Sequence, residues 1–270
     1  MYIAIDDTYG HAGDGKSEYV TNRRRTHLAV IFPDSEVQHI RTQIRKYLNE
    51  VTVLTGISAK EFHFVEIYNR SGPWEPLRED ENSLNIKLFE FFACIYSKYK
   101  WPVFIQTVDD RTFADHGIGK IHAQFDGLDL GKREDISLFM LITKIKAAYK
   151  GSTESINLVI DEGRKKPGNL FGNEIFHDWQ GDYHGTYQSS SAEALLQISD
   201  FLAFCVNRVT HTSLKQNRTD MDNWFIKLVS AMEINCRDLS PAALPINFNF
   251  NDIDAIHRID RIRKGIESSN

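Results

Sequence analysis

The stretch Ile156-Asn157-Leu158-Val159-Ile160-Asp161-Glu162 decides how the rest of the sequence is interpreted. Its first five residues are almost continuously apolar, which is typical of a strand buried on both faces of a sheet. The run then ends in two acidic residues, Asp161 and Glu162. The stretch Tyr2-Ile3-Ala4-Ile5-Asp6-Asp7 has the same order, an apolar strand followed by carboxylates. Two such strands predict a sheet that is covered on both faces and carries acidic side chains where its strands end.

Further strands and amphipathic helices alternate along the chain. We expect strands at residues 26–32 and 102–108, an extended segment at 61–67, and helices at 34–51, 79–98, 134–149 and 191–209. This alternation predicts the α/β class, with a mixed sheet flanked by helices. Isoleucines recur at helical spacing between Ile253 and Ile266 and predict a helix that docks on the rest. We therefore expect a domain at 1–210 and a C-terminal helical extension at 211–270.

Composition and charge narrow the class of protein. The chain has 270 residues, of which 41% are hydrophobic and 26% charged, as in an ordinary globular protein. Its net charge of −5 argues against a simple architectural DNA-binding protein, although bound metal ions would reverse the local charge. The longest apolar run, residues 91–96, is too short to span a bilayer. With no leader-like N-terminus and three cysteines lacking CxxC spacing, we expect a cytoplasmic protein and no membrane partner.

Residues Gly10 to Ser17 match the phosphate-loop pattern GxxxxGK[ST], and Asp161 could hold magnesium in such an NTPase. The surrounding sequence fits this interpretation poorly. Asp6 and Asp7 precede the loop and would repel a polyphosphate. Too few residues follow Ser17 to form a crossover helix before the next strand. We expect a polar hairpin loop here and keep a nucleotide-binding NTPase as an alternative.

Acidic residues form the candidate catalytic site. Asp6 and Asp161 end two of the expected strands, and strand ends are where α/β proteins place their sites. Asp200 lies in a helix that is apolar nearly all round, so its carboxylate must be paired, capped or bound to metal. The segment at 61–67 adds Glu61 or Glu66, and strand alternation does not decide between them.

Carboxylates gathered at strand ends suit hard cations such as Mg²⁺ or Mn²⁺. Two such ions about 4 Å apart can activate water and stabilise the leaving oxygen in phosphodiester cleavage. We expect Asp6, Glu61, Asp161 and Asp200 as metal ligands, with Glu66 as the rival to Glu61. Basic residues that could contact nucleic-acid phosphates are Arg164, Lys165 and Lys166, together with Arg23, Arg24 and Arg25.

Four segments occur in an order that resembles a family. They are residues 2–8, 61–63, 158–163 and 190–202. The set is similar to the bacterial and phage family called "domain of unknown function thirty-eight hundred", over about residues 1–210. Mild departures are Asp7 in place of a common Glu, Thr8-Tyr9 before Gly10, and Ser199 in place of Ala. The resemblance implies a ribonuclease H-like fold and a carboxylate-bound two-metal site, with Asp6, Glu61, Asp161 and Asp200 at the family's acidic positions.

These observations predict a metal-dependent phosphodiester hydrolase, a nuclease whose substrate is DNA or RNA. Besides the NTPase, a non-enzymatic interaction or phage-defence module with a degenerate acidic pocket stays open as an alternative. A homodimer or a partner protein is compatible with either function.

Overall fold

A five-stranded mixed sheet forms the centre of the computed structural model, which describes residues 1–10, 16–20, 23–79, 83–118, 123–236, 244–245 and 247–268. The strand order is β3-β2-β1-β6-β7, and β2 alone runs against the other four. The strands are β1 (Tyr2–Gly10), β2 (Arg24–Phe32), β3 (Val103–Val108), β6 (Ile156–Asp161) and β7 (Tyr183–Gln188). A separate hairpin pairs β4 (Gln124–Phe125) with β5 (Leu128–Asp129).

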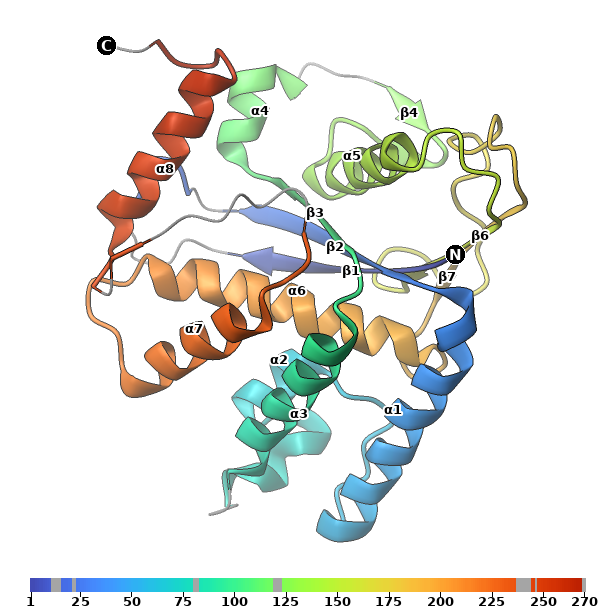
Figure 1. Cartoon of the computed structure of the whole chain (residues 1–270), viewed down its shortest axis with the longest axis vertical. Coiled ribbons are helices and arrows are strands. Elements are labelled where there is room, and N and C mark those ends of the chain that lie inside the picture. The colour runs from blue at the N-terminus through green and yellow to red at the C-terminus, as the bar shows by residue number, and fades with distance from the viewer. Residues whose placement is uncertain are drawn as a thin grey trace.

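Helices cover both faces of this sheet, so the protein belongs to the mixed α/β class. Figure 1 shows α5 (Arg133–Ala148) and α6 (Ala194–Ser213) on opposite sides of the strands. On the α6 side lie α1 (Asp34–Thr55), α2 (Phe64–Asn69), the 3-10 helix η1 (Gly72–Arg78), α3 (Leu84–Tyr99) and α7 (Asp220–Met232). The remaining described helices are α4 (Asp110–His116) and α8 (Phe250–Arg263).

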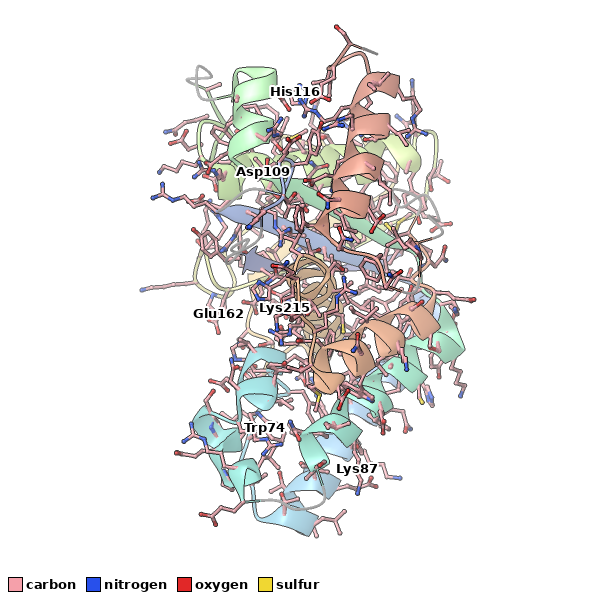
Figure 2. The ribbon with its side chains drawn as sticks, turned by 90° about the vertical axis from the view of Figure 1, so that its left-hand side faces the viewer. Trp74, Lys87, Asp109, His116, Glu162 and Lys215 are labelled. Atoms are coloured by element: carbon pink, nitrogen blue, oxygen red, sulfur yellow. The ribbon has the colours of Figure 1, made fainter. Side chains whose placement is uncertain are left out.

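Alternation along β1 divides the core in two. Ala4 packs in the cluster on the α6 side, whereas Ile3 and Ile5 pack in the cluster on the α5 side. The α6-side cluster is rich in buried aromatic rings that contact one another at their edges, among them Phe62, Phe64, Phe89, Phe92 and Phe201. Trp74 is fully buried among α2, η1 and α3 (Figure 2).

Most of the expected elements are present, with shifted ends. The strand that begins at Tyr2 continues past its two acids to Gly10, because β2 pairs with it over its whole length. The helix expected at 79–98 begins at Leu84 and follows η1. The extended segment expected at 61–67 is wrong, because residues from Phe64 onward form α2. Strand β7 and helices α4 and α7 have no counterpart among the elements expected from the sequence.

The C-terminal part packs on the rest through α7 and α8. The expected boundary at residue 210 falls inside α6. Phe250 and Ile253 of α8 pack on Val20 and Leu214, but the stripe of isoleucines is not wholly buried, since Ile259 is 68% exposed. No helix in the described part of the chain is long and apolar enough to cross a membrane.

We expect the aromatic cluster to dominate stability on the α6 side. Replacing Phe92 by Ala should lower the free energy of unfolding by about 3–5 kcal/mol, because the ring is 1% exposed and its loss leaves a cavity. Urea denaturation followed by circular dichroism measures this change. The control Leu54→Ala, at a residue that is 84% exposed, should change it by no more than about 0.5 kcal/mol. Equal losses in the two variants would contradict a dominant role for the buried rings.

Candidate functional site

Parallel pairing brings the two strand-end acids together. β1 and β6 pair in parallel with Ile5 opposite Ile160, so the next residues, Asp6 and Asp161, leave the paired region side by side. Both point to the α6 face, because Ala4 and Val159, two residues before them, belong to the cluster on that side. The Asp7 N–H donates to Asp6 Oδ1 at 2.7 Å, and the Gly163 N–H donates to Asp161 Oδ2 at 3.4 Å.

Asp200 approaches this pair from α6. The helix lies against β1 and is held there by a buried hydrogen bond from Ser199 Oγ to the Ala4 carbonyl, at 2.9 Å. Asp200 is half-buried, and its Oδ2 accepts the N–H of Phe64, the first residue of α2, at 2.9 Å. The expectation that this acid must have a partner is therefore met by a backbone donor.

Glu61 completes the group from the loop before α2. Ser190 Oγ donates to Glu61 Oε2, and the side-chain oxygen of Gln197 accepts the N–H of Phe62 at 3.1 Å, which anchors the loop to α6. The sequence gives only weak signals for these supporting roles, because a serine before a helix and a glutamine within one have many uses.

Glu66 lies elsewhere, in the first turn of α2. Its carboxylate is 3.5 Å from Nδ1 of His63 and rests against Gly72, where an added Cβ would lie 2.9 Å from Oε1. Of the two rivals, Glu61 is the one whose charge acts on Asp161 and Asp200. The strand alternation that left this choice open does not apply, since the segment turns into a helix at Phe64.

Burial and neighbouring negative charge raise the pKa values of the three aspartates. Burial and then the negative charges of Asp200 and Asp161 raise the pKa of Asp6 well above its ordinary value. Burial likewise raises the pKa of Asp161, with Glu61 adding to the effect against the Gly163 N–H. Burial raises the pKa of Asp200 to about 6, opposed by His63 and the Phe64 N–H and assisted by Asp161 and Glu61.

We call Asp6, Glu61, Asp161 and Asp200 the carboxylate cluster. Its donors are backbone N–H groups and one hydroxyl, and no lysine or arginine among the described residues forms an ion pair with it. This oxygen set, whose negative charge is balanced by no lysine or arginine of the described chain, fits a hard divalent cation. As the side chains stand, no three of the described His, Cys, Asp and Glu residues are placed to ligate one ion. Binding would require the carboxylates to rotate toward a shared point.

Several of the basic residues expected to contact phosphates interact with other side chains of the protein. Arg24 is 6% exposed and donates to Asn207, and Arg25 pairs with Asp7 through one terminal nitrogen. Arg164 pairs with Asp135 on the α5 face. Lys165 Nζ lies 5.9 Å from the centre of the Tyr187 ring.

Two further basic residues are exposed, Arg23 and Lys166. Glu162, next to Asp161, extends at the margin of the molecule (Figure 2) and belongs to no ion pair among the described residues.

The phosphate-loop match does not have its required surroundings. Residues 11–15 lie outside the described part of the chain, and 16–20 and 23 form no helix before β2 begins. Ser17 Oγ donates to Asp254 of α8, which fastens the serine of the motif to the C-terminal helix.

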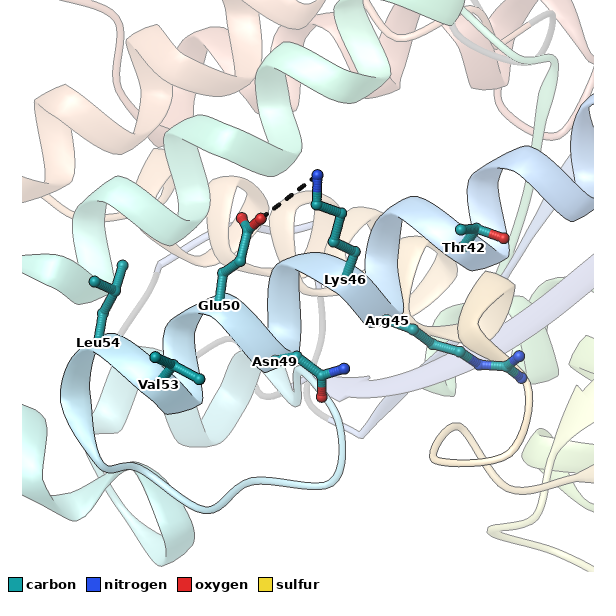
Figure 3. A pocket seen from close by; sticks show the side chains of 7 residues that line it. All are labelled: Thr42, Arg45, Lys46, Asn49, Glu50, Val53 and Leu54. Atoms are coloured by element: carbon teal, nitrogen blue, oxygen red, sulfur yellow. Dashed lines mark ion pairs between the residues drawn. The ribbon is translucent and has the colours of Figure 1, made fainter.

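A hollow of about 690 Å³ lies along the outer face of α1, away from the carboxylate cluster (Figure 3). All its lining residues belong to this one helix, including Lys46 and Glu50, which form an ion pair at 3.7 Å. None of them is a member of the carboxylate cluster or donates a hydrogen bond to it.

Comparison of the chain with protein-family models, with curated proteins and with solved structures gives no match. The site must therefore be understood from its own geometry and charge.

We expect the carboxylate cluster to lower the free energy of unfolding of the metal-free protein as the pH rises. The pKa of Asp200 is raised in the folded state, so its contribution to stability is present below the ordinary value of 3.8 and is lost as the pH rises through about 6. Asp200→Asn keeps an acceptor for the Phe64 N–H but cannot ionise. Between about pH 4 and pH 8, the unfolding free energy of wild type minus that of the variant should fall by on the order of 2 kcal/mol.

Urea unfolding in EDTA measures this difference across the pH range. A difference that stays constant, or that grows with pH, would mean that Asp200 serves as a structural anion and that its neighbours do not destabilise its charged form.

Proposed function

We propose that this protein is a metal-dependent phosphodiester hydrolase, a nuclease that uses the carboxylate cluster to bind Mg²⁺ or Mn²⁺. The observation that carries the proposal is that four carboxylates from four separate segments gather at one site without a lysine or arginine partner in the described chain, and that burial and neighbouring negative charge raise the pKa values of the three aspartates among them. Such an arrangement costs stability unless a cation compensates it.

The architecture supports a ribonuclease H-like assignment within the α/β class. The central strand β1 pairs with an antiparallel neighbour on one side and a parallel neighbour on the other. Asp6 lies in β1, Asp161 lies in its parallel neighbour β6, and Asp200 lies in α6, which crosses the sheet. The family resemblance implies acids from two strands and a helix in this way. Membership of that family is part of the proposal.

In this proposal Asp6 and Asp161 hold the ions from the sheet, and Asp200 and Glu61 close the site from the α6 side. Bound divalent cations would supply an activated water and stabilise the leaving oxygen of the diester. The Phe64 N–H keeps Asp200 oriented, and Ser190 keeps Glu61 oriented. Such supporting hydrogen bonds fix ligand geometry and are worth about 10–100-fold in metal affinity or activity.

The two alternatives have less support. An NTPase would need the Ser17 hydroxyl for magnesium, but this group is bonded to Asp254. The carboxylate cluster is the feature that favours an enzyme over a binding module without catalysis, because cations held by carboxylates can activate water.

The test is Mn²⁺-dependent cleavage of labelled single- and double-stranded DNA and RNA, together with the melting temperature with and without Mn²⁺. Manganese should raise the melting temperature, by an amount equivalent to about 2.7 kcal/mol at a hundred times the dissociation constant. Asp161→Asn and Glu61→Gln should each lower cleavage by more than about a hundredfold, because they remove ligands and not only their supports.

Matched controls are Glu162→Gln, next to Asp161, and Glu66→Gln, the rival of Glu61. Both should retain activity and the manganese shift. If the wild type is neither stabilised by Mn²⁺ nor active on any of the four substrates, the hydrolase proposal fails and the binding module takes its place. If Glu66→Gln loses activity and Glu61→Gln keeps it, the assignment of the fourth ligand is wrong.

A further inference from the structure

A pocket of about 400 Å³ lies on the α5 side of the sheet edge that carries the carboxylate cluster, and it has three arginines in its wall. Its lining comes from the end of β1, the start of β2, the first turn of α5 and the turn after β6. The lining residues are Tyr9, Arg25, Arg133, Glu134, Gly163 and Arg164. Three guanidinium groups and one carboxylate therefore line the wall. We call it the arginine pocket.

Acids outside the lining hold the three guanidinium groups in place. Arg25 pairs with Asp7 and Arg164 pairs with Asp135, whose side chains are 17% and 4% exposed, less than the arginines they hold. Asp135 is itself fixed, because its Oδ2 accepts the Asp129 N–H at 2.8 Å.

Arg133 pairs with Asp110 of α4, and its guanidinium lies 5.1 Å from the centre of the Phe113 ring. Each of the three ion pairs is made through one terminal nitrogen, and a guanidinium has five N–H donors in a rigid fork. Arginines held in this way keep N–H donors for a further anion. Because their side chains are already fixed, binding that anion costs them little conformational entropy.

The pocket and the carboxylate cluster share the same edge of the sheet. Gly163 lines the pocket while its N–H donates to Asp161 Oδ2. Arg164 follows Asp161 by three residues, a separation of at most about 11 Å along the chain. Asp6 belongs to the cluster, and its neighbour Asp7 holds Arg25 on the opposite face. A strand of nucleic acid crossing this edge would reach both sites with phosphates close together in its sequence.

We propose that the arginine pocket binds a backbone phosphate of a nucleic-acid strand whose neighbouring diester lies at the carboxylate cluster. The inference rests on the proposed function and specifies its substrate as a strand with more than one phosphate. Arginine and phosphate match in bidentate geometry, so the contact positions the strand and does not read its sequence.

The experiment compares Arg133→Gln with Lys132→Gln. Arg133 lines the pocket, whereas Lys132 is its chain neighbour, is 60% exposed and does not line it. Binding of a short fluorescein-labelled single-stranded DNA is measured by anisotropy in EDTA, so that no cleavage occurs. Arg133→Gln should weaken binding about fivefold to tenfold and reduce the slope of log affinity against log salt by about one, whereas Lys132→Gln should leave both near the wild type. Equal effects of the two variants would overturn the proposal.

A second variant guards against misfolding. Arg164→Lys keeps a charge beside the buried Asp135 but removes the fork, and it should also weaken binding while retaining the wild-type melting temperature. If both Arg133→Gln and Arg164→Lys fold and bind DNA as the wild type does, the proposal is wrong. Competition with inorganic phosphate and with a mononucleotide identifies the source of the anion. DNA that binds no better than either of them would indicate a small-anion site and would also overturn it.

Hydrolysis of bis(p-nitrophenyl) phosphate separates this inference from the proposed function. This diester has no second phosphate, so the arginine variants should hydrolyse it at the wild-type rate in Mn²⁺ while their kcat/KM on DNA falls about fivefold to tenfold. Wild type that hydrolyses neither substrate would defeat the proposed function, and the EDTA binding measurements would still decide whether the pocket recognises a strand. Equal losses on both substrates would place the arginines in the reaction itself and overturn the phosphate assignment.

Discussion

The parallel pairing of β1 with β6 is the constraint on which the arrangement of this protein depends. It places two apolar strands next to each other at the centre of the sheet, and their pairing with each other ends at the same level, at Ile5 and Ile160. Because side chains alternate along both strands, Asp6 and Asp161 must then point to the same face. Everything else at the site, from α6 to the loop before α2, is arranged around that pair.

The sheet also separates two different electrostatic environments at this edge. On the α6 face, carboxylates face one another and are supported by backbone N–H groups. On the α5 face, Asp7 and Asp135 are matched by Arg25 and Arg164. The difference follows from register, since Asp6 and Asp7 are adjacent in sequence but lie on opposite sides. A shift of one residue in β1 would exchange the two environments.

Sequence patterns predicted the α/β class and the strands that carry Asp6 and Asp161, because continuous apolar runs report burial directly. They failed at Glu61–Ile67, where alternating aromatic residues suggested a strand. There Phe62 and Phe64 are buried by long-range contacts with α3 and α6, and the Asp200 carboxylate accepts the first N–H of α2. No local pattern contains that information.

Other misses had local signals. Capping boxes begin two unpredicted helices, with Asp109 and Thr112 at α4 and Thr219 and Asp222 at α7. The pairing of Arg25 with Asp7 could not be predicted, because it depends on which face of the sheet each residue occupies. The clustering of Asp200 and Glu61 with the strand acids depends in the same way on how α6 crosses the sheet.

The two buried phenylalanines on either side of His63 have a consequence for how the site can move. Phe62 and Phe64 are 0% exposed, and the N–H of each is bonded to a side chain of α6. The residues that follow Glu61 are thus tied to α6, and Ser190 donates to Glu61 itself, so this segment is not built to swing as a lid. Its conformational entropy is lost when the protein folds, not when a ligand arrives. The small movements left to the site are rotations of the carboxylates about their own side-chain bonds.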